Sequence, residues 1–197
     1  MPGGKTIRVR FPTTAAAIVA LFLGGQSASA YSATYTTLYG GPFTRDFGTD
    51  VLFHGDFRTS GAMLGLAIDH TLLDLGSGFA LLGEFQTTRY LVARPVTEFS
   101  AGLGVGYRMN APGNLPVTIE FYMGPSYALD PFTALSGAVP SRHKWLNYFS
   151  NAITFGIPHA PGWSLALRTF HRSGMYGVYA RNLDEGSTVG AGIRYRF

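Results

Sequence analysis

Two polar side chains near the C-terminus, His171 and Ser173, have the types and spacing of a general base and a nucleophile. A serine hydroxyl attacks a carbonyl group efficiently only when a neighbouring base takes its proton. Residues two apart on a strand leave the same face with roots about 6 to 7 Å apart, so a leaning imidazole can reach the hydroxyl. The base also needs a group that fixes its tautomer, and Glu185 is the candidate. The pattern predicts hydrolysis by a serine that a histidine activates.

Two segments of alternating residues, 163–173 and 189–197, must position these side chains. A period of two is typical of a β-strand, because successive side chains point to opposite faces. In both segments one face is apolar and the other carries arginines, as in strands with lipid outside and a polar interior. His171 and Ser173 fall on the lipid face, and Glu185 does so too if the register continues.

The first 30 residues have the features of a secretory signal peptide. Lys5, Arg8 and Arg10 precede a short apolar run, and Ala28-Ser29-Ala30 is a small-residue cleavage site. The run is too short to span a membrane as a helix, although an N-terminal anchor is the alternative. The mature chain, 31–197, then has 12 basic residues (15 less the three of the signal) and 11 acidic ones. With so little net charge, we expect no nucleic-acid partner.

Composition narrows the fold class. The chain has 26 glycines, 14% aromatic and 13% charged residues, and no cysteine. No apolar run after the signal is long enough for a membrane helix, which favours an outer-membrane barrel or a secreted β-sandwich. The lack of cysteine excludes disulfides and thiolate metal sites, and the histidines lack metal-ligand spacing, so we expect no cofactor.

Eight strand-like segments follow the signal: 33–43, 62–73, 79–90, 98–109, 117–129, 145–157, 163–173 and 189–197. Long connections at 44–60, 130–143 and 176–187 tend to alternate with short turns, as in barrels with long extracellular loops and tight periplasmic turns. Eight strands close a barrel whose interior side chains can fill, so transport is not expected. The prediction is an all-β fold, an eight-stranded antiparallel up-and-down transmembrane β-barrel in the cell outer membrane.

Charged residues of both signs fall on the inward face of this barrel. They are Glu84, Glu98, Glu120, Arg108, Arg168, Arg194 and Arg196. Because an unpaired buried charge is costly, we expect them to form a paired network. Aromatic residues near strand ends, Tyr107, Trp145, Trp163 and Tyr195, fit belts at the two membrane interfaces.

The last hairpin resembles the lipid A 3-O-deacylase (PagL) family, in which a His-x-Ser on the seventh strand precedes a Glu by the interval seen here. Outside this hairpin the resemblance is one of architecture. It implies that Ser173 is the nucleophile, His171 the general base and then acid, and Glu185 the orienting carboxylate. The implied reaction is hydrolysis of the ester-linked 3-hydroxyacyl chain at position 3 of lipid A, with lipopolysaccharide of the outer leaflet as the partner.

The chain departs from this family beside the serine. The family has Asn directly after the Ser, where this chain has Gly174, and the family's loop Asn has an approximate counterpart, one position off, in Asn182. Backbone N–H groups at Gly174 and the side chain of Asn182 are therefore the candidates for stabilising the oxyanion. The terminal Phe197, after Tyr195 and Arg196, resembles the signature that outer-membrane assembly machinery recognises.

Two interpretations without catalysis remain open. In the first, His171 and Ser173 are interfacial residues at a strand end, Glu185 is a solvated loop acid, and the barrel is structural. In the second, the barrel is an adhesin-like surface protein that acts through the loops 44–60 and 130–143.

Overall fold

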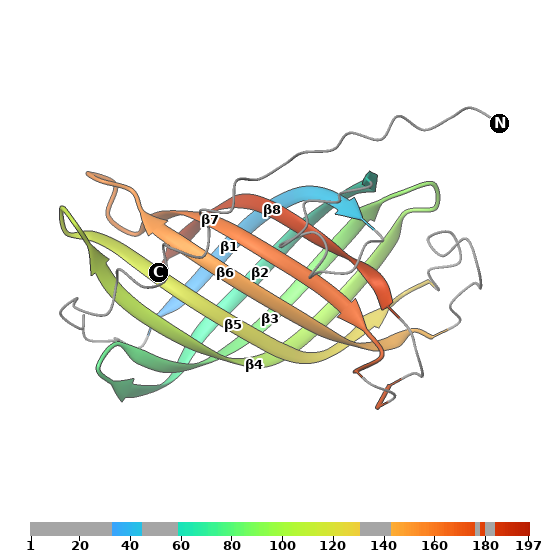
Figure 1. The fold of residues 1–197 in the computed structure, drawn as a ribbon, viewed down its shortest axis with the longest axis horizontal. Coiled ribbons are helices and arrows are strands. Elements are labelled where there is room, and N and C mark those ends of the chain that lie inside the picture. The colour runs from blue at the N-terminus through green and yellow to red at the C-terminus, as the bar shows by residue number, and fades with distance from the viewer. Residues whose placement is uncertain (1–32, 45–58, 131–142, 176–177, 180–183) are drawn as a thin grey trace, which may run out of the picture.

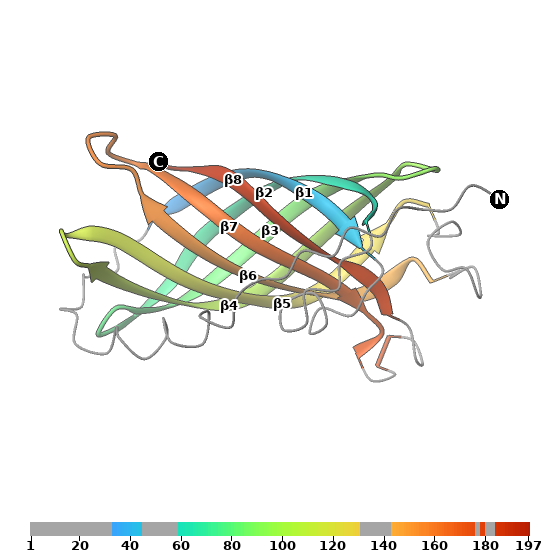
Figure 2. The same ribbon diagram turned by 45° about the horizontal axis from the view of Figure 1, so that its top comes forward.

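The computed structural model describes residues 33–44, 59–130, 143–175, 178–179 and 184–197. Eight antiparallel strands, each paired with the next and the last with the first, form a closed barrel whose strands are tilted against its axis (Figures 1 and 2). They are β1 (Thr34–Thr44), β2 (Thr59–Gly76), β3 (Phe79–Leu91), β4 (Val96–Ala111), β5 (Leu115–Ala128), β6 (Trp145–Gly156), β7 (Trp163–Ser173) and β8 (Asp184–Arg196). The predicted fold is confirmed, and closure excludes the sandwich.

The structure does not describe the N-terminal segment, and it lengthens some of the predicted strands. The predicted signal peptide, residues 1–30, lies outside the described residues. Across the described ranges, no helix is long and apolar enough to cross a membrane. The strands β2, β4 and β8 are longer than the predicted segments. Apolar and polar residues alternate only where one face of a strand meets lipid. Outside the membrane both faces meet water, but the backbone hydrogen bonds between strands can continue there.

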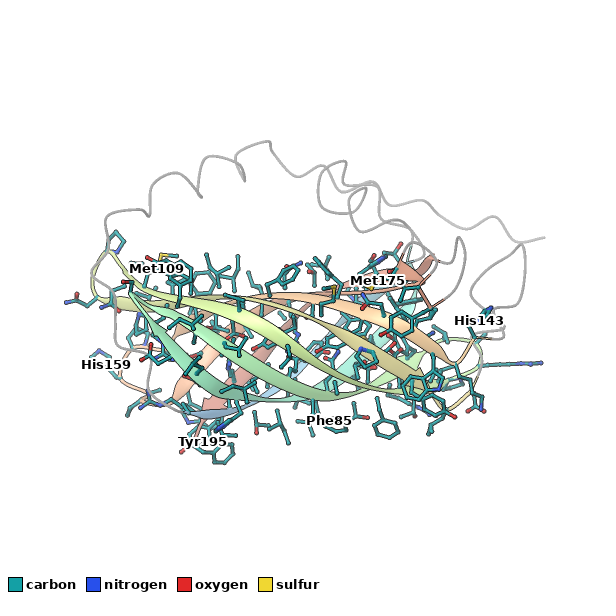
Figure 3. The ribbon with its side chains drawn as sticks, turned by 90° about the horizontal axis from the view of Figure 1, so that it is seen from below. Phe85, Met109, His143, His159, Met175 and Tyr195 are labelled. Atoms are coloured by element: carbon teal, nitrogen blue, oxygen red, sulfur yellow. The ribbon has the colours of Figure 1, made fainter. Side chains whose placement is uncertain are left out.

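The exterior of the barrel is apolar. Exposed outward side chains include Leu38, Leu66, Leu103, Ile119, Leu165 and Ile193. Aromatic pairs flank this band, and Figure 3 shows Phe85 and Tyr195 projecting outward. The Trp163 and Tyr195 rings lie 4.8 Å apart near the chain terminus, and those of Tyr127 and Trp145 lie 4.8 Å apart at the opposite end. An apolar band between aromatic girdles identifies an outer-membrane barrel, with its short turns on the periplasmic side.

Inside the barrel, arginines and carboxylates form a paired network as predicted, with corrections at three arginines. Arg168 pairs with Glu84, and Arg194 lies 2.6 Å from Glu120 and 3.5 Å from Asp69. The partner of Glu98 is Arg172, at 3.2 Å, which was not in the predicted set. Arg108 and Arg196, which were in it, line the periplasmic mouth instead. Their strand positions lie beyond the closed part of the interior, where charge can face water.

Tyrosine side chains fill the rest of the interior. Tyr122 and Tyr148 are fully buried, and glycines on β4 leave room for both. A Cβ atom at Gly104 would lie 2.5 Å from the Tyr122 ring, and one at Gly102 would lie 2.4 Å from the Tyr148 hydroxyl. The glycines thus relieve crowding in the lumen, and the filled interior agrees with a barrel that is not a channel.

Candidate functional site

The pair His171 and Ser173 lies at the extracellular end of β7, on its outward face. Both side chains are half-buried, whereas Phe170 and Arg172 on the alternate positions are buried in the interior. Eight residues separate His171 from Trp163 in the periplasmic girdle, which corresponds to roughly 19 Å along the membrane normal for a strand tilted by about 45°. The pair is therefore near the outer boundary of an apolar band about 25 Å tall.

The hydroxyl that contacts the imidazole comes from the neighbouring strand. His171 Nδ1 lies 3.0 Å from the Oγ of Ser187, which is its direct partner across β7 and β8. This hydroxyl belongs to a different serine from the predicted Ser173. Directly opposed residues have Cβ atoms about 4.5–5.5 Å apart, closer than positions two apart on one strand.

A β-bulge places Glu185 beside this pair in the backbone. Arg172 is paired with Gly186 and Ser173 with Asp184, so Glu185 is the extra residue between their partners. Without the bulge, the register of the rest of this ladder would pair Glu185 with Ser173. Gly186 makes the bulge possible, since its φ is +113° and a Cβ atom there would lie 2.3 Å from the Thr44 carbonyl oxygen. The side chain of Glu185 lies outside the described part of the structure.

An asparagine of β6 borders the serine on its other side. Asn147 is the direct partner of Ser173, faces outward like Trp145 and Phe149, and is 5% exposed. A second outward asparagine, Asn151, donates to the Thr169 hydroxyl at 3.1 Å. The extracellular ends of β6, β7 and β8 thus form a polar patch beside the apolar band of the exterior.

The backbone after Ser173 turns sharply. Gly174 is buried, and its carbonyl oxygen accepts a hydrogen bond from the Tyr179 N–H at 3.1 Å. Met175 has a φ of +50°, in the left-handed region that side chains disfavour. Such local strain is often found at functional sites. The other predicted oxyanion residue, Asn182, lies outside the described residues.

Sequence reasoning missed two members of this patch, Ser187 and Asn147. The alternating pattern placed both on outward-facing positions: Ser187 on the outward face of β8, and Asn147 among the apolar residues of the outward face of β6. The pattern does not say which strand position lies opposite the candidate pair. Among the described residues, no three His, Asp or Glu side chains gather as they would around a metal ion.

No family model matches the chain, and no curated protein matches its sequence. Solved structures match its fold. The outer membrane enzyme PagL is 13% identical, with a TM-score of 0.56 over 83% of this chain and 98% of that chain. Neisserial surface protein A is 11% identical, with a TM-score of 0.51 over 87% and 100%. Ail of Yersinia pestis is 16% identical, with a TM-score of 0.47 over 85% and 100%. Because PagL and the surface protein both match, the likeness shows the fold and leaves function to the site.

Proposed function

We propose that this barrel is an outer-membrane esterase that removes the ester-linked 3-hydroxyacyl chain from lipid A. One observation carries the proposal: an imidazole and a hydroxyl face the lipid side by side near the outer boundary of the apolar band. Polar and ionisable residues at membrane depth are costly, and they commonly mark functional sites. The substrate that lies at this level of an outer membrane is the acylated part of lipopolysaccharide.

In this proposal Ser173 is the nucleophile and His171 the base. The Ser173 oxygen attacks the ester carbonyl while its proton passes to Nε2 of His171, giving a tetrahedral oxyanion. The oxyanion collapses, the bond to the sugar oxygen breaks, and His171 returns the proton to that oxygen. Water then repeats the sequence on the acylated serine and releases the 3-hydroxy fatty acid.

The neighbours of the imidazole suit this assignment. When Nδ1 carries the proton, it donates to Ser187 Oγ, and Nε2 is then the basic nitrogen. Ser187 is only 4% exposed, whereas Ser173 is half-buried and can be approached from the bilayer. Glu185, next to Gly186 in the bulge, is the carboxylate that would stabilise the imidazolium.

Lipid A from cells that express the chain tests the proposal. Mass spectrometry should show the loss of one hydroxyacyl group in cells with the unchanged protein, and no loss with Ser173→Ala, because the nucleophile is absent. Ser187→Ala is the matched variant: it should retain deacylation at a reduced rate. The assignment is wrong if Ser187→Ala abolishes the reaction and Ser173→Ala does not. Unchanged lipid A from cells with a folded barrel would leave the non-catalytic structural or surface-interaction barrel.

Asn147 is expected to donate a hydrogen bond to the oxyanion through its side-chain amide. Gly174 has no side chain that could do this. Asn147 is the direct cross-strand partner of Ser173 and is almost fully buried. Replacing Asn147 with Ala should lower kcat about 10²-fold with little change in KM, since the donor acts on charge that develops in the transition state. Kinetics on purified lipid A in detergent would measure this. Asn151→Ala, on the same face of β6, is the control. Its kcat should stay within about threefold of the unchanged protein, a much smaller change than the loss of an oxyanion donor causes.

A further inference from the structure

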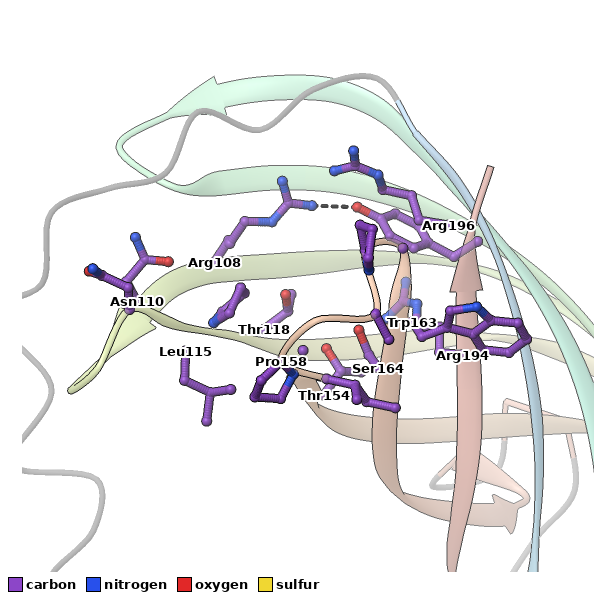
Figure 4. A pocket seen from close by; sticks show the side chains of 18 of the residues that line it. Arg108, Asn110, Leu115, Thr118, Thr154, Pro158, Trp163, Ser164, Arg194 and Arg196 are labelled. Atoms are coloured by element: carbon purple, nitrogen blue, oxygen red, sulfur yellow. Dashed lines mark hydrogen bonds between the residues drawn. The ribbon is translucent and has the colours of Figure 1, made fainter.

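The periplasmic mouth of the barrel contains a cavity of about 800 Å³, at the end opposite the candidate site (Figure 4). It is lined by the end of β8, the start of β1 and the turns that join β4 to β5 and β6 to β7. A volume of this size is within the range of small-molecule sites. Its lining includes four basic residues, Arg108, Arg194, Arg196 and His159, and one acid, Glu120.

Three arginines converge there on one tyrosine. The guanidinium of Arg194 lies 4.0 Å from the centroid of the Tyr35 ring, and Arg108 donates a hydrogen bond to the Tyr35 hydroxyl, drawn as a dashed line in Figure 4. Arg196 is the direct partner of Tyr35 across β1 and β8. Cations held this close repel one another unless negative charge lies between them.

The nearby carboxylates offset only two of the three positive charges of this cluster. Glu120 and Asp69 both pair with Arg194, from the interior side. Among the described residues, Arg108 and Arg196 have no carboxylate partner. Arg194 itself is 3% exposed, yet its Nε has no hydrogen-bond acceptor in the described part of the barrel. A buried donor of this kind costs free energy until an acceptor reaches it.

We infer that the periplasmic mouth is a binding site for a phosphate group. Guanidinium groups donate paired hydrogen bonds that match the oxygens of phosphate, and a doubly charged group with three terminal oxygens can bridge several arginines. A carboxylate has one charge and two oxygens, which suits a single arginine. Threonine and serine hydroxyls at Thr118, Thr154 and Ser164 also line the cavity and can hold the polar body to which the phosphate is attached.

The test uses the complete barrel folded in an uncharged detergent. Inorganic phosphate is titrated at constant ionic strength against chloride, and backbone amide shifts are followed by NMR. Saturable shifts are expected at the cavity turns, for instance at Gly113 and Gly162. Arg108→Gln and Arg196→Gln should each raise the Kd about tenfold, because each removes a charge-assisted hydrogen bond. Neither replacement touches the deacylation site, so this result is independent of the proposed function.

Arg89→Gln is the matched control. Arg89 is exposed at the extracellular end, where it donates to Thr97 at 2.6 Å, and its replacement should leave the Kd unchanged. Shifts that do not saturate, or an equal loss of affinity with Arg89→Gln, would overturn the inference. A parallel titration in nanodiscs identifies the source of the phosphate. Shifts that need phosphatidic acid, whose headgroup is a phosphate monoester, in the nanodisc indicate a lipid headgroup, and shifts with free phosphate alone indicate a soluble ligand.

Discussion

Replacing His171 with glutamine is expected to slow the release of hydroxy fatty acid from lipid A by at least about 10³-fold, because members of a nucleophile–base unit act together. Glutamine keeps a polar side chain beside Ser187 but cannot take the proton from Ser173. The loss should appear in kcat, with KM almost unchanged, since the imidazole acts on the proton and not on the bound acyl chain. Release of the fatty acid by purified barrel in detergent measures both constants.

His70→Gln is the control for this experiment. His70 is exposed near the periplasmic end of β2, where its Nδ1 lies 2.9 Å from the Thr34 hydroxyl. Its replacement should leave kcat unchanged. If His171→Gln were as active as His70→Gln while the unchanged protein deacylates lipid A, the base would have to be another group, and the assignment of His171 would fail.

Replacing Arg168 with methionine is expected to lower the free energy of unfolding by about 3–5 kcal/mol. The change removes the partner of Glu84 and leaves a carboxylate buried inside the barrel. It also removes the bond from Arg168 Nε to Ser150 at 2.9 Å and the stacking of the guanidinium 4.9 Å from the Tyr39 ring. Urea unfolding of the barrel reconstituted in lipid measures the loss.

Two further variants separate charge from packing. Arg89→Met removes an exposed arginine and should cost no more than about 1 kcal/mol. The double variant Arg168→Met with Glu84→Gln should recover part of the loss, because no buried charge is then left without a partner. A cost for Arg168→Met no larger than that for Arg89→Met would show that the buried pair does not stabilise the barrel.

The architecture could be predicted because each strand faces lipid on one side and the closed interior on the other. A strand between lipid and a closed interior must alternate at every second residue, so the pattern from Trp163 to Ser173 gives both the strand and its outward face. The same rule placed Glu84, Glu120, Arg168 and Arg194 inside, and the cost of burying charge predicted that they pair. These inferences need no knowledge of which strand positions lie opposite one another.

The contacts between strands depend on register, which the sequence alone left undetermined. The parity of Asn147 and Ser187 was visible, but only the closed barrel places one beside Ser173 and the other beside His171. Partners across the interior, such as Arg172 and Glu98, depend in the same way on how the strands are staggered around the barrel.

The sequence by itself determined the strands, their two faces and the polar residues on the lipid side, since each follows from the environment of one chain segment. The tertiary structure decided the hydroxyl bonded to His171, the bulge at Glu185 and the arginine cluster around Tyr35. Each of these joins residues from different strands. Their distance is set by barrel closure and by local irregularities such as Gly186, which a period of two does not encode.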